Sequence, residues 1–183
     1  MEFKRFDFTG AQQLRSVVEQ IYRGSYAEAI ASGDLFDQPA AFMERFDAYA
    51  SSPLLDLVLV YEDGKAVGQT WGWPLTPNSK WWSGLDADGL DTAETGSRTF
   101  ALSEIMVVRS HAGSGIAHAL HDEILSGRGE QRATLLVEPE NQRAYLAYQK
   151  WGWNKAGTLQ PSWPSAPALD VLMRKLPIKD ADS

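Results

Sequence analysis

The residues best suited to chemistry are two glycines, Gly113 and Gly115, in the stretch SEIMVVRSHAGSGIAHALHDEIL, residues 103–125. An apolar strand pattern precedes this glycine turn, and an amphipathic helix pattern follows it. Because glycine has no Cβ atom, successive backbone N–H groups can close on an anion. The first N–H groups of the helix and its positive dipole end add to the attraction. The pattern indicates a diphosphate site, with an ordinary strand-to-helix connection as the alternative.

The glycine turn differs from two common nucleotide-binding motifs. It lacks the Lys-Ser/Thr pair of a P-loop. It is also too short for the three-glycine dinucleotide fingerprint. The sequence therefore argues against ATP and NAD as the natural ligands.

A second motif follows in LLVEPENQRAYLAYQKWGWNKAG, residues 135–157. It fits the pattern Asn-x-x-Ala-x-x-x-Tyr-x-x-x-Gly-aromatic at Asn141, Ala144, Tyr148, Gly152 and Trp153. With the glycine turn before it, the chain resembles the GNAT superfamily of acetyl-CoA-dependent N-acetyltransferases. The resemblance is specific from about Ser103 to Gly157 and only general elsewhere.

The family's phosphate loop, Arg/Gln-x-x-Gly-x-Gly/Ala, falls on Ala112, Gly115 and Ala117, with Gly113 as an extra glycine. Ala112 stands where the family usually has Arg or Gln. This removes one side-chain donor near the phosphates and leaves the backbone N–H groups in place. The residues that we expect to contact the cofactor are Ile105, Met106, Val107, Val108, Ala112, Gly113, Ser114, Gly115, Ile116, Ala117, Asn141 and Arg143.

The resemblance also implies roles in the transfer of an acetyl group from a thioester to an amine. The backbone of Ile105–Val108 would pair with the pantetheine amides as a pseudo-strand. Tyr148 matches the family's tyrosine that protonates the leaving thiolate, and core packing is its alternative role. Glu104, at the start of the apolar strand, is our candidate to accept the amine proton, and simple surface exposure is the alternative.

Three further polar residues have ordinary alternatives. Asn141 is expected either to bond the cofactor or to cap the helix that follows it, and both roles can hold together. Arg143 and Lys150 suit the 3′-phosphate of coenzyme A, although solvated helix charges are commoner.

Aromatic residues supply the candidates for the acceptor side. Trp71 and Trp73 share one face of their expected strand, and with Tyr26, Trp81 and Trp82 they could wall a pocket for a ring or a cation. Core packing is the alternative. Trp81 and Trp82 lie in the polar stretch 76–98, which we expect to be a long loop over the acceptor side of the cleft.

Metal binding is not expected anywhere in the chain. The acidic residues of the 76–98 loop, Asp86, Asp88, Asp91 and Glu94, do not have EF-hand spacing. His118 should point to solvent from its helix, and His111 precedes the glycine turn, so neither predicts a zinc site together with His121. The chain has no cysteine, which excludes disulfides and a thiol nucleophile.

Charge and hydropathy limit the partners. The chain has 17 basic and 24 acidic residues, a net charge of −7, which argues against nucleic acid and suits an amine acceptor. No apolar run approaches the roughly 18 residues of a membrane helix, and the first ten residues do not read as a signal peptide. We expect a soluble cytoplasmic protein with a small-molecule amine as its partner. A homodimer stays open.

Periodicity predicts the elements that position these residues. Strands are predicted over Glu2–Phe8, Leu54–Glu62, Lys65–Pro74, the apolar run after Ser103, Ala133–Val137, Trp153–Leu159 and Ala168–Leu176. Helices are predicted from Thr9, as N-cap, to Ile21, from Pro39 to Ala50, after Gly115, and from Asn141 to Trp151. Asp63-Gly64 should turn a hairpin, residues 161–167 a proline-rich turn, and residues 178–183 should fray.

The sequence thus predicts one α/β domain over residues 1–183. The GNAT resemblance implies a mostly antiparallel central sheet flanked by helices, with strands that splay where the cofactor enters. The expected activity is an acyl-CoA-dependent N-acyltransferase that moves acetyl from acetyl-CoA to a primary amine. A non-catalytic acyl-CoA sensor, or a GNAT-like transferase with another acyl donor such as an aminoacyl carrier, are the alternatives.

Overall fold

The computed structural model describes residues 1–162 and 166–178. Residues 163–165 of the predicted proline-rich turn, and residues 179–183 of the segment predicted to fray, lie outside these ranges. In chain order the elements are β1 (Glu2–Phe6), α1 (Phe8–Gln13), α2 (Arg15–Ser25), α3 (Ala27–Ser32), α4 (Pro39–Tyr49), β2 (Asp56–Glu62), β3 (Lys65–Pro74), β4 (Leu85–Asp86), β5 (Thr99–Val107), the 3-10 turn η1 (Arg109–His111), α5 (Ile116–Leu125), β6 (Arg132–Val137), α6 (Gln142–Lys150), β7 (Asn154–Leu159) and β8 (Leu169–Lys175).

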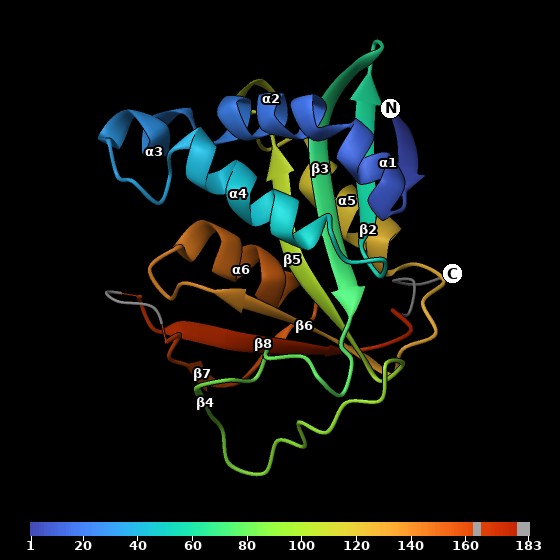
Figure 1. Ribbon diagram of the computed structural model, residues 1–183, viewed down its shortest axis with the longest axis vertical. Helices are drawn as coiled ribbons and strands as arrows, with labels where there is room; N and C mark the ends of the chain where they lie inside the picture. The colour runs from blue at the N-terminus through green and yellow to red at the C-terminus, as the bar shows by residue number, and fades with distance from the viewer. Residues whose placement is uncertain (163–165, 179–183) are drawn as a thin grey trace. The chain divides into compact units, whose positions relative to one another are not determined.

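The strands form an eight-stranded sheet in the order β1-β2-β3-β5-β6-β8-β7-β4 (Figure 1). The β5–β6 pair is parallel, with Thr99–Ala101 opposite Arg132–Thr134. The β1–β2, β2–β3, β6–β8, β7–β8 and β4–β7 pairs are antiparallel. The predicted α/β class, with a mixed and mostly antiparallel sheet flanked by helices, is confirmed.

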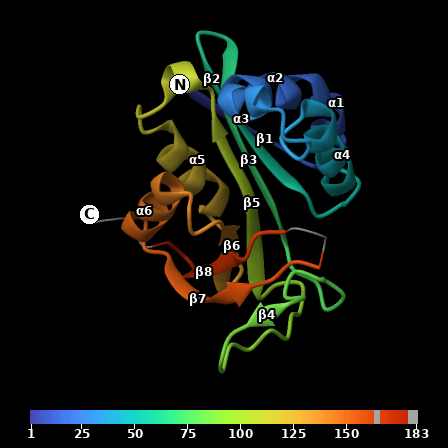
Figure 2. The ribbon, with the colours of Figure 1, turned by 90° about the vertical axis from the view of Figure 1, so that its left-hand side faces the viewer.

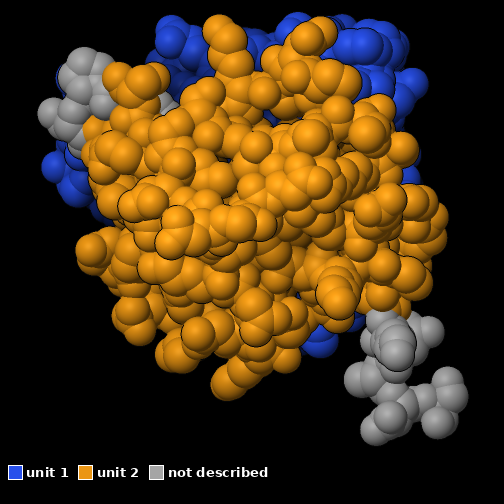
Figure 3. Space-filling view, turned by 90° about the horizontal axis from the view of Figure 1, so that it is seen from below, with its two compact units in different colours: residues 1–73, 104–124 blue, residues 74–103, 125–183 orange. Residues whose placement is uncertain are grey.

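The chain divides into two compact units, coloured separately in Figure 3. Unit 1 comprises Met1–Trp73 and Glu104–Ile124, and unit 2 comprises Pro74–Ser103 and Leu125–Ser183. The division falls inside β5, between Ser103 and Glu104. The candidate proton acceptor and the glycine turn therefore belong to unit 1, and the motif that carries Tyr148 belongs to unit 2.

In unit 1, helices α1 to α4 lie on one face of β1–β3 and α5 lies on the other (Figures 1 and 2). Side chains from α2, α4 and the strands share one buried cluster, which includes Val18, Tyr22, Phe42, Phe46 and Trp71. On the opposite face a Cβ at Gly68 would lie 3.0 Å from Leu120 Cδ1 of α5. Because both faces are covered, the central residues of β2 and β3 are buried on both sides of the sheet.

Two local predictions in unit 1 have different outcomes. The hairpin turns at Asp63 and Gly64, both with positive φ, as predicted. The prediction of Thr9 as the first helix cap is wrong. Asp7 is the N-cap, and its Oδ1 accepts a hydrogen bond of 2.9 Å from Gly10 N. The predicted single helix also breaks at Leu14 into α1 and α2.

Unit 2 is built on the antiparallel strands β6, β8, β7 and β4, with α6 as its helix. Its buried side chains include Trp153, Leu159 and Leu172. The stretch 76–98 is not wholly a loop, because Leu85 and Asp86 form β4 and pair with Leu159 and Thr158 of β7. That segment is thus anchored to the sheet at its centre as well as at its ends.

Candidate active site

The glycine turn lies between η1 and α5 in unit 1. Gly113 and Gly115 have φ values of 80° and 86°, which favour glycine. A Cβ atom at either position would meet no atom within 4 Å, so the space beside both backbones is open. The first hydrogen bond of α5 runs from Ala119 N to Gly115 O, 3.1 Å. The four N–H groups that precede it have no acceptor within the helix, so the turn has the features of an anion site.

The side chains beside this turn are engaged in local contacts. Ser114 Oγ donates to the carbonyl oxygen of His111. His111 Nε2 lies 3.0 Å from Glu62 Oε2, and Arg109 forms an ion pair with Glu28. A bound anion would therefore rely mainly on backbone N–H groups, as expected for a turn with Ala112 in place of Arg or Gln.

The strand β5 leads into the turn, and its backbone groups alternate between its two edges. Val108 N donates to Val67 O of β3 at 2.9 Å, and Glu104 O accepts from Thr70 Oγ1 at 2.7 Å. Residues two apart on a strand direct their backbone groups to the same edge. Ile105 and Val107 therefore direct their N–H and C=O groups away from β3. Of the four residues predicted to pair with pantetheine, these two have the suitable backbone orientation.

Glu104 is half-buried on β5, and the alternation of side chains along a strand places it on the same face as Met106. Met106, two residues further along, belongs to the buried cluster of that face, and Val108 packs against it. Burial raises the pKa of Glu104 to about 7, and the positive charge of Arg45 on α4 opposes part of this rise. A carboxyl group with this pKa exchanges its proton near neutral pH. Glu104 can therefore act as a general base.

Tyr148 lies in α6 of unit 2 and is half-buried. Its ring makes edge contacts with Trp151 and Trp153, at centroid distances of 5.6 and 6.1 Å. Asn141 is the N-cap of this helix, since its Oδ1 accepts from Ala144 N at 3.3 Å. The helix-cap role of Asn141 is confirmed. Arg143 and Lys150 are exposed, which agrees with their alternative role as solvated charges on the helix surface.

A buried carboxylate that the sequence analysis missed anchors α6. Asp170 of β8 is 5% exposed, accepts a hydrogen bond of 2.9 Å from Tyr145 and lies 2.6 Å from Lys155 Nζ. Burial, followed by the Asp170 hydrogen bond, raises the pKa of Tyr145. The available signal was a single acid within the apolar strand LDVLM. This contact fixes the helix face three residues before Tyr148.

A family model described as the acetyltransferase (GNAT) family matches residues 18–153. The chain belongs to the GNAT acetyltransferase family.

Solved structures share the fold of this GNAT chain. An acetyltransferase from Thermus thermophilus has a TM-score of 0.66 and 13% identity, over 96% of this chain and 98% of that one. The ribosomal-protein-S18-alanine N-acetyltransferase from Escherichia coli has a TM-score of 0.66 and 12% identity, over 100% and 97%. An aminoglycoside 6′-N-acetyltransferase complexed with coenzyme A has a TM-score of 0.63 and 14% identity, over 98% and 100%. A comparison with curated proteins finds no sequence match.

The aromatic candidates of unit 1 divide between core and surface. Trp71 is 0% exposed and packs against Phe42 and Phe46, at 6.0 and 5.4 Å between ring centroids. It is therefore a core residue in this structure and not an exposed pocket wall. Trp73, on the same face of β3, is half-buried and stacks on Tyr49 at 4.9 Å.

Three aromatic rings of the GNAT chain, those of Phe42, Tyr22 and Tyr26, stack on one another in this order. Tyr22 stacks on Phe42 at 3.8 Å with 3° between planes, and Tyr26 stacks on Tyr22 at 5.0 Å. Tyr26 is 36% exposed, whereas Tyr22 is 2% exposed and donates from its hydroxyl to Asp37 O. Of the predicted acceptor residues in unit 1, Tyr26 has the largest exposed fraction.

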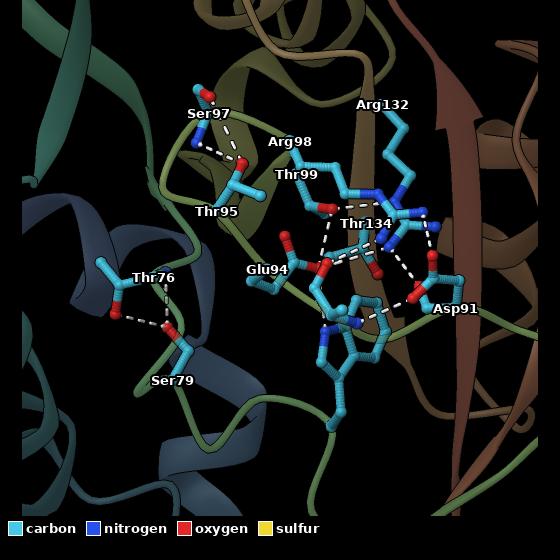
Figure 4. Close-up of polar contacts among 12 residues, drawn as sticks. Thr76, Ser79, Asp91, Glu94, Thr95, Ser97, Arg98, Thr99, Arg132 and Thr134 are labelled. Atoms are coloured by element: carbon cyan, nitrogen blue, oxygen red, sulfur yellow. Dashed lines mark hydrogen bonds and ion pairs between the residues drawn. The ribbon is translucent and has the colours of Figure 1, made fainter.

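The 76–98 segment of unit 2 is held by Glu94, whose carboxylate is buried (Figure 4). Its Oε1 accepts from Trp82 Nε1 at 3.0 Å and from Thr99 Oγ1 at 2.9 Å, and it lies 3.3 Å from Arg132 Nη2. Trp82 thus has a structural contact that we did not expect. The half-buried Trp81 lies beside it in sequence.

Asp91 of the same segment pairs with Arg98 at 2.8 Å, and this hydrogen bond lowers the pKa of Asp91 (Figure 4). Two of the four acidic residues of this segment, Asp91 and Glu94, are therefore each paired with an arginine. The net negative field of the segment is correspondingly weaker. Its predicted place over the acceptor side stays a prediction.

Two histidines of α5 lie close together beside Asp122. His118 is exposed, as predicted, while His121 is 0% exposed and places its Nδ1 2.7 Å from Asp122 Oδ1. Ligand atoms of the three residues lie within 4.8 Å of one another. The carboxylate already bonds the buried imidazole, so this arrangement is explained by a helix-surface hydrogen bond.

No helix in the described part of the chain is long and apolar enough to cross a bilayer.

Proposed function

We propose that this GNAT chain transfers an acetyl group from acetyl-CoA to a primary amine of a small molecule, by direct attack within a ternary complex. Family membership and the open glycine turn support acetyl-CoA as the acetyl donor. The aminoglycoside 6′-N-acetyltransferase that shares the fold was crystallised with coenzyme A. In the proposal, the N–H groups from Gly113 to Ala117 hold the diphosphate, and the outward backbone groups of Ile105 and Val107 bind pantetheine.

The observation that carries the proposal is the open glycine turn before α5, preceded by the strand β5 that holds the carboxyl group of Glu104. Burial raises the pKa of Glu104 to about 7. An alkylamine is mostly protonated at neutral pH and must lose a proton before it attacks. A carboxylate with an ordinary pKa is a weak base for this step, and a raised pKa makes it a better one. Glu104 accepts the amine proton, directly or through water.

The remaining steps form the amide and release the thiol. The amine nitrogen attacks the thioester carbonyl carbon, and the C–S bond breaks as the amide forms. The nitrogen gives up its second proton to water in this step, and Tyr148 later regains from water the proton that it donates. The thiolate leaves and takes a proton from the Tyr148 hydroxyl, in the role that the family motif assigns to this position. Arg143 is available for the 3′-phosphate of coenzyme A.

Calorimetry with acetyl-CoA and with CoA, followed by a free-thiol assay across a panel of small amines, tests the proposal. We expect micromolar binding of both and thiol release with at least one amine. Binding without thiol release from any amine would favour the sensor alternative. Failure to bind either form of coenzyme A would favour another acyl donor.

A further inference from the structure

Arg45 of α4 is a half-buried arginine. Among the residues that the structure describes, no carboxylate lies within 4.0 Å of its guanidinium. Asp47, two positions further along α4, pairs with Arg15 at 2.8 Å instead. Partly buried charges in proteins usually have a partner, because desolvation is costly. The guanidinium of Arg45 can therefore accept a further anionic partner.

Aromatic rings and one hydrogen bond hold the guanidinium in place. Its Nη1 donates to Phe36 O at 3.0 Å. Its Cζ lies 3.9 Å from the centroid of the Phe36 ring and 5.9 Å from that of Phe42. Arginine has five N–H donors, and the Phe36 carbonyl uses one. Since rings cover the face of the group, its edge donors are left for a planar acceptor such as a carboxylate.

Arg45 belongs to the same group of side chains as the proposed base. Phe42, beside it, stacks on Tyr22, and both rings lie in the cluster that Met106 of β5 joins two residues after Glu104. Burial raises the pKa of both Glu104 and Tyr22, and the positive charge of Arg45 opposes part of the rise in each. It does not form an ion pair with Glu104 within 4.0 Å, so the cation and the carboxyl group are separate binding elements on one face of unit 1.

We propose that Arg45 binds an anionic group of the acceptor, a carboxylate in the best case, while Glu104 receives the proton of its amine. This inference rests on the proposed function and narrows its acceptor to amines that also carry an acid, such as amino acids. It adds an acidic group to the small amine that we expected. The 76–98 segment attracts cations less than its four acidic residues suggest, because Asp91 and Glu94 are paired with arginines.

Matched acceptor pairs test the proposal through the ratio of their kcat/KM values. L-phenylalanine is compared with 2-phenylethylamine, which lacks only the carboxylate. Glycine, β-alanine and 4-aminobutyrate vary the separation between amine and acid, and O-phosphoethanolamine against ethanolamine tests a phosphate in place of the carboxylate. We expect at least one acid to exceed its neutral partner about tenfold, as one charge-assisted contact allows.

Variants at Arg45 then test whether its guanidinium causes the preference for the acid over its neutral partner. Arg45→Met should bring the ratio to about one by lowering kcat/KM for the acid only, and Arg45→Lys should keep part of it. Phe36→Leu removes the stacked ring but not the charge, so the ratio should persist. Glu44→Gln, on the exposed side of α4, is the matched control. A merely structural role of Arg45 would lower kcat/KM for both members of each pair equally.

A binding measurement separates this inference from the proposed reaction. Calorimetry of the same acceptor pairs with CoA-loaded protein needs no turnover. Arg45-dependent binding of the acid without thiol release would support the anion site and refute the reaction. Thiol release with an acid-to-neutral ratio near one, or a ratio that Arg45→Met leaves unchanged, would overturn the anion site and leave the reaction standing.

Discussion

Replacing Glu104 by Gln should stabilise the protein at alkaline pH while it removes activity. Burial raises the pKa of this carboxyl group from 4.5 to about 7. Between these values the native protein holds a proton that the unfolded chain has released. Because the native state then binds more protons, the free energy of unfolding falls as pH rises through this window and levels off above about pH 7. The Glu104→Gln variant has no carboxyl group at this position, so its free energy of unfolding does not fall in this pH window for this reason.

The size of the effect follows from the pKa difference. At about 1.4 kcal/mol per pKa unit, the change from 4.5 to about 7 sets an upper limit of about 3.5 kcal/mol. Glu104 is half-buried and keeps some contact with solvent, so we expect about 1 to 3 kcal/mol. Glu104→Gln should therefore be more stable than the wild type by this amount at about pH 8, and nearly equal to it at about pH 4.5.

Urea unfolding followed by tryptophan fluorescence at both pH values measures the difference. Glu44→Gln, an exposed change on α4, should show no comparable stabilisation at alkaline pH. The kcat/KM of the wild type should rise with pH around a midpoint of about 7, and Glu104→Gln should lose this limb. Equal unfolding free energies of wild type and Glu104→Gln at alkaline pH would refute the argument that burial sets the pKa of this group.

Four further changes test other parts of the site. Gly115→Glu places a side chain and a negative charge in the open turn, so calorimetry should show loss of CoA binding in a folded variant; unchanged affinity would remove the diphosphate assignment. Ala112→Arg should tighten CoA binding by about 1 to 2 kcal/mol, and weaker binding would count against the loop alignment. Tyr148→Phe should lower kcat about 10²-fold with little change in CoA affinity, and a wild-type kcat would make Tyr148 a packing residue. Glu94→Gln should cost about 2 kcal/mol in thermal or urea unfolding, because Arg132 loses its buried partner; an unchanged stability would show that the segment is held by other contacts.

Local signals in the sequence were sufficient for the motifs and for most elements. The glycine turn, the Asp63-Gly64 hairpin, the Pro39 helix start and the Asn141 cap each depend on residues within a few positions of one another. A positive φ, a fixed proline φ or a capping oxygen acts at that range. Hydrophobic periodicity marks β2, β3 and α5 for the same reason. Two of these features, the glycine turn and the motif that begins at Asn141, carry the resemblance to the GNAT family.

Features that depend on distant segments required the tertiary structure. Glu104 looked like any acid at the start of a strand, and its raised pKa arises because the helical face that carries Tyr22 and Arg45, from much earlier in the chain, buries it. From the sequence, Trp71 and Tyr26 are equally good candidates for the wall of an acceptor pocket. The tertiary structure distinguishes them, because Trp71 is buried and Tyr26 is exposed. Glu94 read as a solvated acid until Arg132 of β6 was placed beside it. Burial and charge pairing are set by which segments meet in space, and the spacing of residues along the chain does not contain that information.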